Sequence, residues 1–308
     1  MTKPLRVVQV GLGDIGRAAA RLVLEKPHLQ LVGAVDPKFV GRPLMEVLDW
    51  PYRLEGVVTH HIPAADVAIH CTTSRWETAA DELAALVRLG MHCVTSCEQA
   101  LLPDQHDTAR AAELDRLCRE HRVSVVGTGV NPGFVMDTLP ALLTAACQRV
   151  HSIHVRRVVD VATRRPALQR KVGAGLTPAE FDAQLAAGTL RHVGLTDSLL
   201  FVARAIGWED VDVSEKIEPV LGADGRVAGV RQVAHAPNLV WELEMYRGAP
   251  EPRDEIHIEG VPPIHLVIRN GVAGDLATPA MLVNIIPQLL AAPPGLHTMA
   301  ELCLPHFA

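Results

Sequence analysis

The segment LRVVQVGLGDIG, Leu5–Gly16, decides the fold of this chain. It begins as a short β-rich run, Leu5–Val10, and continues into three glycines spaced Gly-x-Gly-x-x-Gly. Gly11 allows a tight turn, Gly13 lets the backbone approach a pyrophosphate, and Gly16 lets a following helix pack closely on the strand. Because this spacing also occurs in ordinary strand–helix turns, the flanking residues must distinguish a dinucleotide-binding loop from such a turn.

The residues on either side complete a dinucleotide-binding unit. A helical pattern starts at Asp14 and Ile15, and the first N–H groups and partial positive charge of such a helix favour phosphate. A second apolar strand, Leu31–Val35, ends on Asp36, about 20 residues beyond the last glycine, where a carboxylate can bind the ribose hydroxyls of NAD. Lys38 could partly offset the repulsion between Asp36 and a 2′-phosphate, so we expect NAD or NADP as the cofactor.

The composition excludes several classes of protein. The 308 residues are 48% hydrophobic, which allows a substantial core, and the length suits two domains of roughly 100–200 residues each. A net charge of −6 offers no general attraction to nucleic acid or to an anionic membrane. No apolar run approaches the ~20 residues of a membrane span, and the N-terminus lacks a signal-peptide pattern. The six cysteines show no metal-binding spacing, so we expect free thiols in a reducing cytoplasm.

Strands and helices alternate as far as residue 127. Further short apolar strands are expected, with helices over residues 77–89 and 104–121 between them. These strands are Val67–Cys71, His92–Ser96 and Val123–Gly127. Helices between short apolar strands imply right-handed crossovers. We therefore predict that residues 1–133 form a dinucleotide-binding Rossmann domain, a doubly wound parallel sheet of the α/β class.

The pattern changes after residue 130. Thr177-Pro-Ala-Glu180 is a capping box that predicts the start of a helix, and Gly222–Gly225 predicts a hairpin. Runs with period-two alternation indicate a mostly antiparallel sheet with helices on one face. These runs are 151–160, 211–221, 229–236, 239–246, 255–259 and 264–268. We predict a second, α+β domain over residues 134–276 and a C-terminal segment, 277–308, that returns to the Rossmann domain.

Three polar segments follow strands of the predicted parallel sheet. Thr72, Thr73 and Ser74 follow the third strand, Ser96–Gln99 follows the fourth, and Thr128–Phe134 follows the fifth. Ligands of such sheets bind beyond the carboxyl ends of the strands. Thr72–Ser74 and Ser96 are therefore candidates to bind cofactor ribose or phosphate. A hydroxyl that caps the next helix is the alternative interpretation of Thr72–Ser74.

Glu98 is the candidate for acid–base catalysis. A carboxyl group beside a nicotinamide, partly shielded from water, can pass protons to and from a nitrogen or oxygen at the carbon that receives hydride. Gln99 stands where related sugar dehydrogenases carry a catalytic lysine, and residues 128–134 lack the cysteine of acylating semialdehyde dehydrogenases. Cys97 lacks a nearby base, because His92 lies at the other end of the same strand. The structural alternative is that Glu98 only complements a helix N-terminus.

Five ordered motifs resemble one known family. They are Gly127–Phe134, Arg157–Asp160, Arg164-Arg165 with Leu168–Lys171 and Gly173–Gly175, His192–Leu195, and Ala292–Gly295. Together they resemble the 2,4-diaminopentanoate dehydrogenase family, which includes the native amine dehydrogenases and is related to dihydrodipicolinate reductase. The resemblance implies a substrate and dimerisation domain after the Rossmann domain, and a homodimer through the second sheet. It also implies NAD(P)-linked interconversion of amines with ketones or aldehydes and ammonia.

The resemblance assigns individual residues as well. Glu98 matches the catalytic glutamate of the family, Asn131 matches an asparagine near the nicotinamide, and His192 matches a histidine of the substrate pocket. Arg157 and Asp160 fall in a motif close to the substrate cavity, and a structural ion pair between Arg157 and an acid such as Asp160 is the alternative.

Departures from the related patterns leave other interpretations open. Asp197 stands where the family often has a glutamate, so we assign it no role. The substrate signature of dihydrodipicolinate reductase, a paired histidine followed by Lys-x-Asp-Ala-Pro-Ser-Gly-Thr, is absent from the sequence. Reduction of a cyclic imine is therefore the second interpretation, and a dinucleotide-binding sensor without turnover is the third. The first is an amine dehydrogenase in which Glu98 assists hydride transfer to an iminium.

Overall fold

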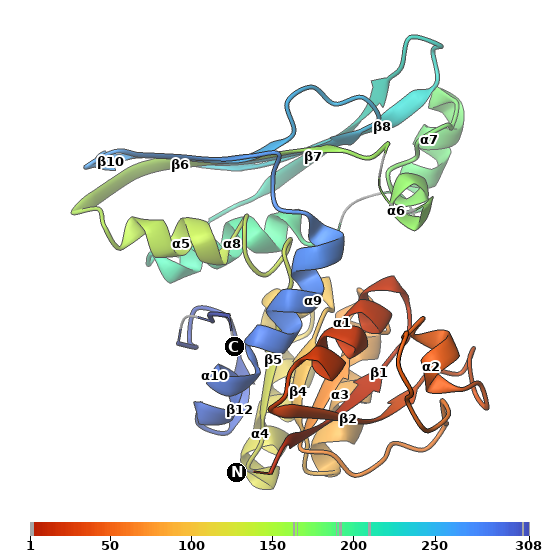
Figure 1. Cartoon of the computed structure of the whole chain (residues 1–308). Helices are drawn as coiled ribbons and strands as arrows, with labels where there is room; N and C mark the ends of the chain where they lie inside the picture. The colour runs from red at the N-terminus through yellow and green to blue at the C-terminus, as the bar shows by residue number, and fades with distance from the viewer. Residues whose placement is uncertain are drawn as a thin grey trace. The chain divides into compact units, whose positions relative to one another are not determined.

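The computed structural model describes residues 3–162, 164, 166–188, 190, 193–208, 211–303 and 305–307. The chain divides into two compact units (Figure 1). The first unit is built from Met1–Gly133 and Ala273–Ala308, and the second unit is built from Phe134–Val272. Each unit contains a six-stranded sheet.

The sheet of the first unit is parallel and has the order β12-β5-β4-β3-β1-β2. Its strands are β1 (Leu5–Val10), β2 (Leu29–Val35), β3 (Val67–His70), β4 (His92–Thr95), β5 (Ser124–Gly127) and β12 (Gly295–His297). The order reverses at β1, because β2 lies on one side of it and β3 on the other. Right-handed crossovers then place α1 (Asp14–Glu25) on one face, and α3 (Trp76–Arg88) and α4 (Thr108–His121) on the other. The predicted doubly wound sheet is confirmed.

Helix α4 begins later than predicted. The sequence suggested one helix over residues 104–121, but Pro103–Gln105 forms a separate 3₁₀ turn, η2. The Asp107 side chain then caps α4 by accepting a hydrogen bond from the Arg110 N–H at 3.0 Å. A second 3₁₀ turn, η1 (Glu98–Leu101), and a short helix, α2 (Leu44–Val47), lie in other connections of this unit.

The C-terminal residues complete the first unit. Helix α9 (Gly274–Asn284) packs against α1, and α10 (Ile286–Ala291) packs against β4 and β5. Strand β12 pairs in parallel with β5 and extends the sheet by one strand. This strand was not predicted, because a run of three residues beside prolines carries no periodic signal.

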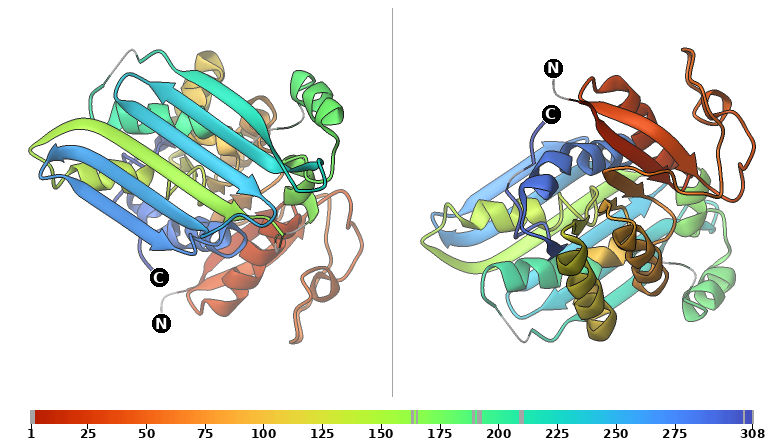
Figure 2. Two further views of the ribbon diagram at one scale, coloured as in Figure 1. Left: turned by 90° about the horizontal axis from the view of Figure 1, so that it is seen from above. Right: turned by 90° about the horizontal axis from the view of Figure 1, so that it is seen from below.

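The sheet of the second unit has the order β11-β10-β6-β9-β8-β7, seen face-on in the left view of Figure 2. Its strands are β6 (Arg149–Asp160), β7 (Ser214–Leu221), β8 (Val227–Ala236), β9 (Leu239–Tyr246), β10 (Arg253–Val261) and β11 (Ile264–Arg269). Only the β6–β9 pair among these neighbours is parallel, so the prediction of a mostly antiparallel sheet is confirmed. The predicted hairpin is the turn between β7 and β8.

Helices cover one face of this second sheet. Helix α8 (Leu195–Ala205) packs on β8 and β9, and α5 (Thr138–Thr144) packs against α8, whereas α6 (Pro166–Lys171) and α7 (Pro178–Ala186) lie in the connection between β6 and α8. The predicted capping box opens α7, because the Thr177 side chain and the Glu180 side chain each accept the other residue's backbone N–H. Buried Asp137 caps α5 and accepts a hydrogen bond from Ser198 of α8 at 2.9 Å, which ties the two helices together.

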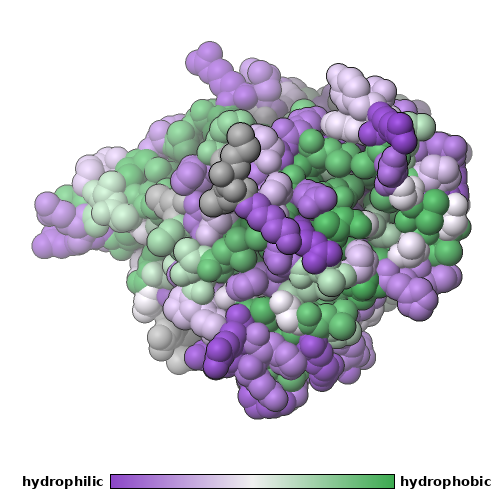
Figure 3. All heavy atoms as spheres, turned by 60° about the horizontal axis from the view of Figure 1, so that its bottom comes forward, coloured by the Kyte–Doolittle hydropathy of each residue, from purple (hydrophilic) through white to green (hydrophobic). Residues whose placement is uncertain are grey.

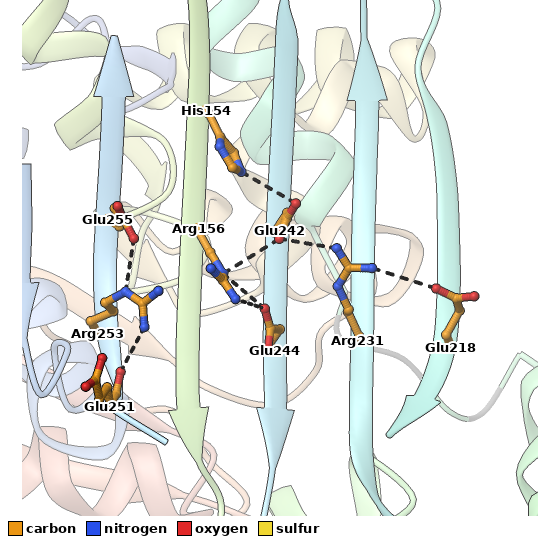
Figure 4. Close-up of polar contacts among 9 residues, drawn as sticks. All are labelled: His154, Arg156, Glu218, Arg231, Glu242, Glu244, Glu251, Arg253 and Glu255. Carbon is orange, nitrogen blue, oxygen red and sulfur yellow. Dashed lines mark hydrogen bonds and ion pairs between the residues drawn. The ribbon is translucent and has the colours of Figure 1, made fainter. Parts of the chain in front are cut away.

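The other face of the second sheet carries charged side chains; we call it the open face (Figure 4). Cross-strand register places Arg156 of β6 opposite Glu242 of β9 and Glu255 of β10. Elsewhere on the surface, the view in Figure 3 shows hydrophilic residues mixed with hydrophobic ones. Within the described part of the chain, every helix is too short or too polar to span a membrane.

Candidate functional site

The glycine loop between β1 and α1 has one open position and two crowded ones. Gly11 has φ +85°, and a Cβ there would lie 2.5 Å from the Cys71 carbonyl oxygen. A Cβ on Gly16 would lie 2.0 Å from the Gly11 carbonyl oxygen, so this glycine lets α1 pack on the loop. A Cβ on Gly13 would meet nothing within 4 Å. The exposed backbone at Gly13 is therefore accessible to a ligand, and a pyrophosphate fits this loop.

Asp36 lies directly after β2 and is held against the glycine loop. Its Oδ2 accepts a hydrogen bond from the Leu12 N–H at 2.8 Å, and its Oδ1 accepts one from the Lys38 N–H at 2.8 Å. Each carboxylate oxygen retains a second lone pair for a ribose hydroxyl. The Lys38 side chain is exposed beside it.

Gln9 supports the loop from within the sheet and was missed by the sequence analysis. Its side chain is fully buried, and its Nε2 donates a hydrogen bond to the Gly11 carbonyl oxygen at 3.0 Å. The signal was present, because an amide in an apolar strand must find partners when the strand is buried. Burial also raises the pKa of the neighbouring Cys71 thiol to about 11, so this thiol is neutral at ordinary pH.

Glu98 is placed at the carboxyl edge of the sheet. It is the first residue of η1, it is half-buried, and it follows the buried Cys97 at the end of β4. The next residue, Gln99, accepts a hydrogen bond from the Trp76 N–H at 2.7 Å and so caps the N-terminus of α3. The segment that carries Glu98 is thus attached to a helix start by its neighbour's side chain.

The segment Thr72–Ser74 does not cap α3. The cap position belongs to Arg75, whose side chain makes no capping hydrogen bond, so the capping interpretation was wrong. Thr73 instead accepts the Arg75 N–H at 3.1 Å, and the Ser74 carbonyl accepts the Gln99 N–H at 3.4 Å. Thr72 forms hydrogen bonds with His70 and Glu82 through its hydroxyl group.

The loop after β5 brings Asn131 to the same edge of the sheet. The Thr128 N–H donates to the Thr95 carbonyl of β4 at 2.9 Å, and the Val130 N–H donates to the Thr278 hydroxyl of α9 at 3.3 Å. The side-chain oxygens of Thr128 and Asn131 are buried and lack a hydrogen-bond partner among the described residues. Buried polar atoms normally have partners, so these two oxygens suit the polar group of a ligand such as a carboxamide.

Arg157 of the second unit is bound within that unit. Its Nη1 lies 2.5 Å from Asp254 Oδ1, its Nη2 donates to the Val272 carbonyl at 2.7 Å, and both charged side chains are buried. The other Asp254 oxygen accepts the Val272 N–H at 2.7 Å. Burial lowers the pKa of Arg157, and Asp254 opposes that shift. The structural partner of Arg157 is therefore Asp254, not Asp160.

Asp160 ends β6 in a backbone-binding role. Its Oδ1 accepts hydrogen bonds from the Ala162 N–H at 2.9 Å and the Gly248 N–H at 3.0 Å. Asp160 and Arg157 are three positions apart, so their side chains leave opposite faces of the strand. Asp197 is buried in α8. His192 and Arg165 lie outside the described residues.

Metal ligation gains no support from the part of the chain that is described. Its His, Cys, Asp and Glu side chains form no group of three that could hold an ion. All six cysteines are free thiols, and Cys93, Cys97 and Cys118 are buried.

The glycine loop at a strand-order reversal and the polar carboxyl edge define the class of dinucleotide-binding α/β oxidoreductases. The family model for the 2,4-diaminopentanoate dehydrogenase C-terminal domain matches residues 134–308. The 2,4-diaminopentanoate dehydrogenase of Acetoanaerobium sticklandii is 34% identical over 98% of this chain and 94% of its own length. The chain therefore belongs to the 2,4-diaminopentanoate dehydrogenase family, and it is an oxidoreductase that acts on CH–NH2 donors.

Solved structures share the fold. The amine dehydrogenase from Mycobacterium smegmatis aligns with a TM-score of 0.85 at 24% identity, over 99% of this chain and 97% of that one. A dihydrodipicolinate reductase from Paenisporosarcina sp. TG-14 aligns with a TM-score of 0.57 at 13% identity, over 96% of this chain and 98% of that one. The expected family, and its likeness in fold to dihydrodipicolinate reductase, are confirmed.

Proposed function

We propose that this enzyme interconverts an amine with a ketone or aldehyde plus ammonia, and that Glu98 moves the protons. The observation that carries the proposal is the position of Glu98. Glu98 follows the carboxyl end of β4. In the sheet, β4 is the neighbour of β3, and β3 is the neighbour of β1, which the glycine loop follows. Ligands of doubly wound sheets bind along this edge. Membership of the family supports the amine chemistry.

The cofactor would be held by residues of the first unit. Gly13 offers open backbone to the pyrophosphate, and the N-terminal N–H groups of α1 at Asp14 and Ile15 favour its charge. The dinucleotide, when bound, supplies or accepts the hydride. Asp36 would bind the ribose hydroxyls and repel a 2′-phosphate, which favours NAD. The exposed Lys38 would partly offset this repulsion, so that NADP also binds, but less tightly than NAD.

Glu98 would act at the carbon that receives hydride. In the aminating direction ammonia adds to the carbonyl carbon and gives a carbinolamine. Glu98 in its acid form donates a proton to the carbinolamine hydroxyl, the C–O bond breaks, and water leaves as the iminium forms. The carboxylate that remains stabilises this cation until hydride reaches it. In the deaminating direction the same carboxylate takes the proton back.

Asn131 and His192 are the remaining candidates for contact with the nicotinamide or the substrate. The Asn131 side-chain oxygen, which is buried and has no partner within the described ranges, can accept a hydrogen bond from a carboxamide or an amine. Arg157 is assigned a different task, because its guanidinium is already bound by Asp254 and Val272. A small neutral carbonyl compound therefore fits the substrate side as well as a diamino acid.

Substitution of Glu98 tests the proposal. Glu98→Gln should lower kcat for amination by about 10³-fold, within the usual range for a general acid, and should leave NADH binding nearly unchanged. Oxidation of NADH with ketones and aldehydes in ammonium buffer measures kcat, and fluorescence titration measures NADH binding. Glu77→Gln, a change of another acidic side chain in the same unit, is the control. Equal activity of Glu98→Gln and the control would refute the acid–base role.

Three outcomes of the same assay would favour other functions. Carbonyl reduction that does not require ammonia would indicate an alcohol dehydrogenase. Full absence of turnover with tight NADH binding would indicate a sensor. Turnover of a cyclic imine alone would favour the chemistry of dihydrodipicolinate reductase.

The open face of the second unit supports a homodimer. It carries both signs of charge in adjacent strands: Arg156 contacts Glu244 at 2.6 Å, and Arg231 contacts Glu242 at 3.4 Å (Figure 4). A surface with interspersed charges of both signs can be complementary to a second copy of itself about a two-fold axis. We propose this face, which the family resemblance also suggests, as the dimer interface.

A further inference from the structure

His70 occupies a position where an imidazole is costly. It is the last residue of β3, which lies inside the parallel sheet between β1 and β4, and its side chain is fully buried. The other residues of β3 are buried and apolar. A buried polar ring destabilises the fold unless both of its nitrogens have partners.

Both ring nitrogens of His70 have partners on different elements. Nδ1 lies 2.8 Å from the Thr95 hydroxyl at the end of β4. Nε2 lies 2.6 Å from Glu82 Oε2 on α3 and 2.8 Å from the Thr72 hydroxyl. The Thr72 hydroxyl also donates to Glu82. His70 thus connects the loop after β3, at Thr72, with the end of β4 and helix α3.

One protonation pattern satisfies every member of this network. The Thr95 hydroxyl oxygen accepts the Cys97 N–H at 3.1 Å, so its own proton is free to bond to His70 Nδ1. Nε2 then carries the ring proton and donates it to the Glu82 carboxylate. The hydrogen bond from His70 is also the main cause of the lowered pKa of Glu82, so the carboxylate that orients the ring stays ionised.

The network is hydrogen-bonded to the turn that precedes Glu98. The Ser96 N–H donates to the backbone carbonyl of His70 at 3.0 Å, and the Cys97 N–H donates to Thr95, which His70 holds. Two consecutive N–H groups of the turn before Glu98 are therefore held by His70, one directly and one through Thr95. A rotation of the Thr95 side chain about χ1 would release the second of them.

We infer that His70, oriented by Glu82, is a positioning residue that sets the direction of the Glu98 carboxylate through Thr95 and the Cys97 N–H. This inference rests on the proposed role of Glu98. When the network is cut at Thr95, the consequence is a loss of turnover rather than of cofactor binding, because among the described residues the Thr95 hydroxyl bonds to His70 and Cys97 and not to the glycine loop, Asp36 or the cofactor-binding candidate Thr72. Misplacement of a catalytic group by about 1 Å can cost roughly 100-fold in rate.

Thr95 offers the sharpest test, because its hydroxyl can be removed or restored with little change of volume. Thr95→Val keeps the shape of the side chain and removes the hydroxyl, and Thr95→Ser keeps the hydroxyl. Ser124→Ala is the matched control, since Ser124 is an equally buried hydroxyl on β5 whose hydrogen bond goes to the Pro293 carbonyl at 3.1 Å. Glu82→Gln tests the orienting carboxylate at the partly exposed end of the network.

The expected results separate a positioning role from a structural one. Thr95→Val should lower kcat for amination by roughly 10- to 100-fold, with NADH affinity and substrate KM within about twofold. Thr95→Ser should restore most of the rate, and Glu82→Gln should show a smaller loss in the same direction. Hydrogen exchange of the Cys97 amide, followed by mass spectrometry of peptides over residues 92–102, should be faster in Thr95→Val and unchanged in Ser124→Ala.

Other results would overturn the inference. A Thr95→Val enzyme that loses thermal stability like Ser124→Ala but keeps its kcat would show that the network only stabilises the core. Failure of Thr95→Ser to restore the rate would show that the hydroxyl is not the linking group. If Glu98→Gln is inactive while Thr95→Val behaves as the wild type, this inference fails alone. An active Glu98→Gln would refute the proposed function and this inference together.

Discussion

The two sheets of this protein use polar residues in opposite ways. In the parallel sheet of the first unit, most of the buried polar side chains lie at the carboxyl edge, at Asp36, His70, Thr95 and Thr128, whereas Ser124 lies at the start of β5. In the second sheet, they spread across one whole face, from Glu218 on β7 to Glu255 on β10 (Figure 4).

The difference follows from how each sheet is covered. Helices lie on both faces of the parallel sheet, so a polar side chain in mid-strand would be buried without water, and only the strand ends are free to bind ligands. The second sheet has helices on one face, so the other face can carry ion pairs at low cost. The carboxyl edge of the parallel sheet therefore suits a small ligand, and the broad charged face of the second sheet suits contact with another protein.

The largest expected effect compares two neighbouring arginines on β6. Arg157 points to the helix-covered face and is buried against Asp254, whereas Arg156 lies on the open face with 34% of its side chain exposed. Arg157→Ala should lower the free energy of unfolding by about 3–5 kcal/mol, because it leaves Asp254 buried without a partner. Arg156→Ala should cost under about 1 kcal/mol. Urea unfolding measures both, and equal losses would contradict the distinction between the faces.

The next effect tests the edge of the parallel sheet. Gly16→Val adds atoms where a Cβ already meets the Gly11 carbonyl oxygen at 2.0 Å, and overpacking of this kind costs about 1–3 kcal/mol. It should lower both thermal stability and NADH affinity. Gly13→Ala adds a methyl group in open space, so it should lower NADH affinity and leave the melting temperature unchanged. Thermal melts and NADH titration separate the two, and a destabilised Gly13→Ala would contradict the open position.

A third prediction concerns the open face as a protein surface. Arg156→Glu places a third acidic side chain beside Glu242 and Glu244, so like charges should repel across and within the face. The dissociation constant of the proposed homodimer should rise by about tenfold or more, roughly 1.4 kcal/mol. Sedimentation velocity measures it, with Lys3→Glu, near the N-terminus of the first unit, as the control. A dimer that is equally stable in both variants would exclude this face.

The smallest effect is a dependence on pH from the open face. A hydrogen bond from His154, helped by Arg231, lowers the pKa of Glu242 from 4.5 to about 2. A carboxylate whose pKa is lower in the folded state stabilises the fold above its unfolded pKa. The contribution should therefore be complete above pH 4.5 and disappear as the pH falls toward 2. The free energy of unfolding, measured between pH 2 and 4.5, should depend less steeply on pH in Glu242→Gln than in the control Glu251→Gln. Identical pH dependence in the two variants would contradict the ion pair.

Much of the first unit was predictable because its signals are local. The glycine spacing, the apolar strands and Asp36 each report on a few adjacent residues, and the strand ends of a parallel sheet meet at one edge in any doubly wound order. The apolar pattern predicted a helix from residue 104, so the later start of α4 was missed. The helix begins at Thr108 because the Asp107 side chain caps it. Strand β12 was missed because a three-residue edge strand is defined by its pairing with β5.

The second unit was less predictable because its important contacts join distant parts of the chain. Arg157 was expected near the substrate or paired with Asp160, yet its partner Asp254 comes from β10, which pairs with β6. The alternation of β6 could show that Arg157 faces inward. It could not show which acid the neighbouring strand brings to it, because register is set by the whole sheet.

By itself, the sequence determined the glycine loop, the class of both sheets, the family and the position of Glu98 after a strand end, since each depends on short-range pattern. Tertiary structure alone decided that Gln9 supports the loop, that Asp254 binds Arg157, and that His70 links α3 to the turn before Glu98. Buried polar side chains require partners, and only the folded chain shows which residue, however distant in the sequence, supplies each one.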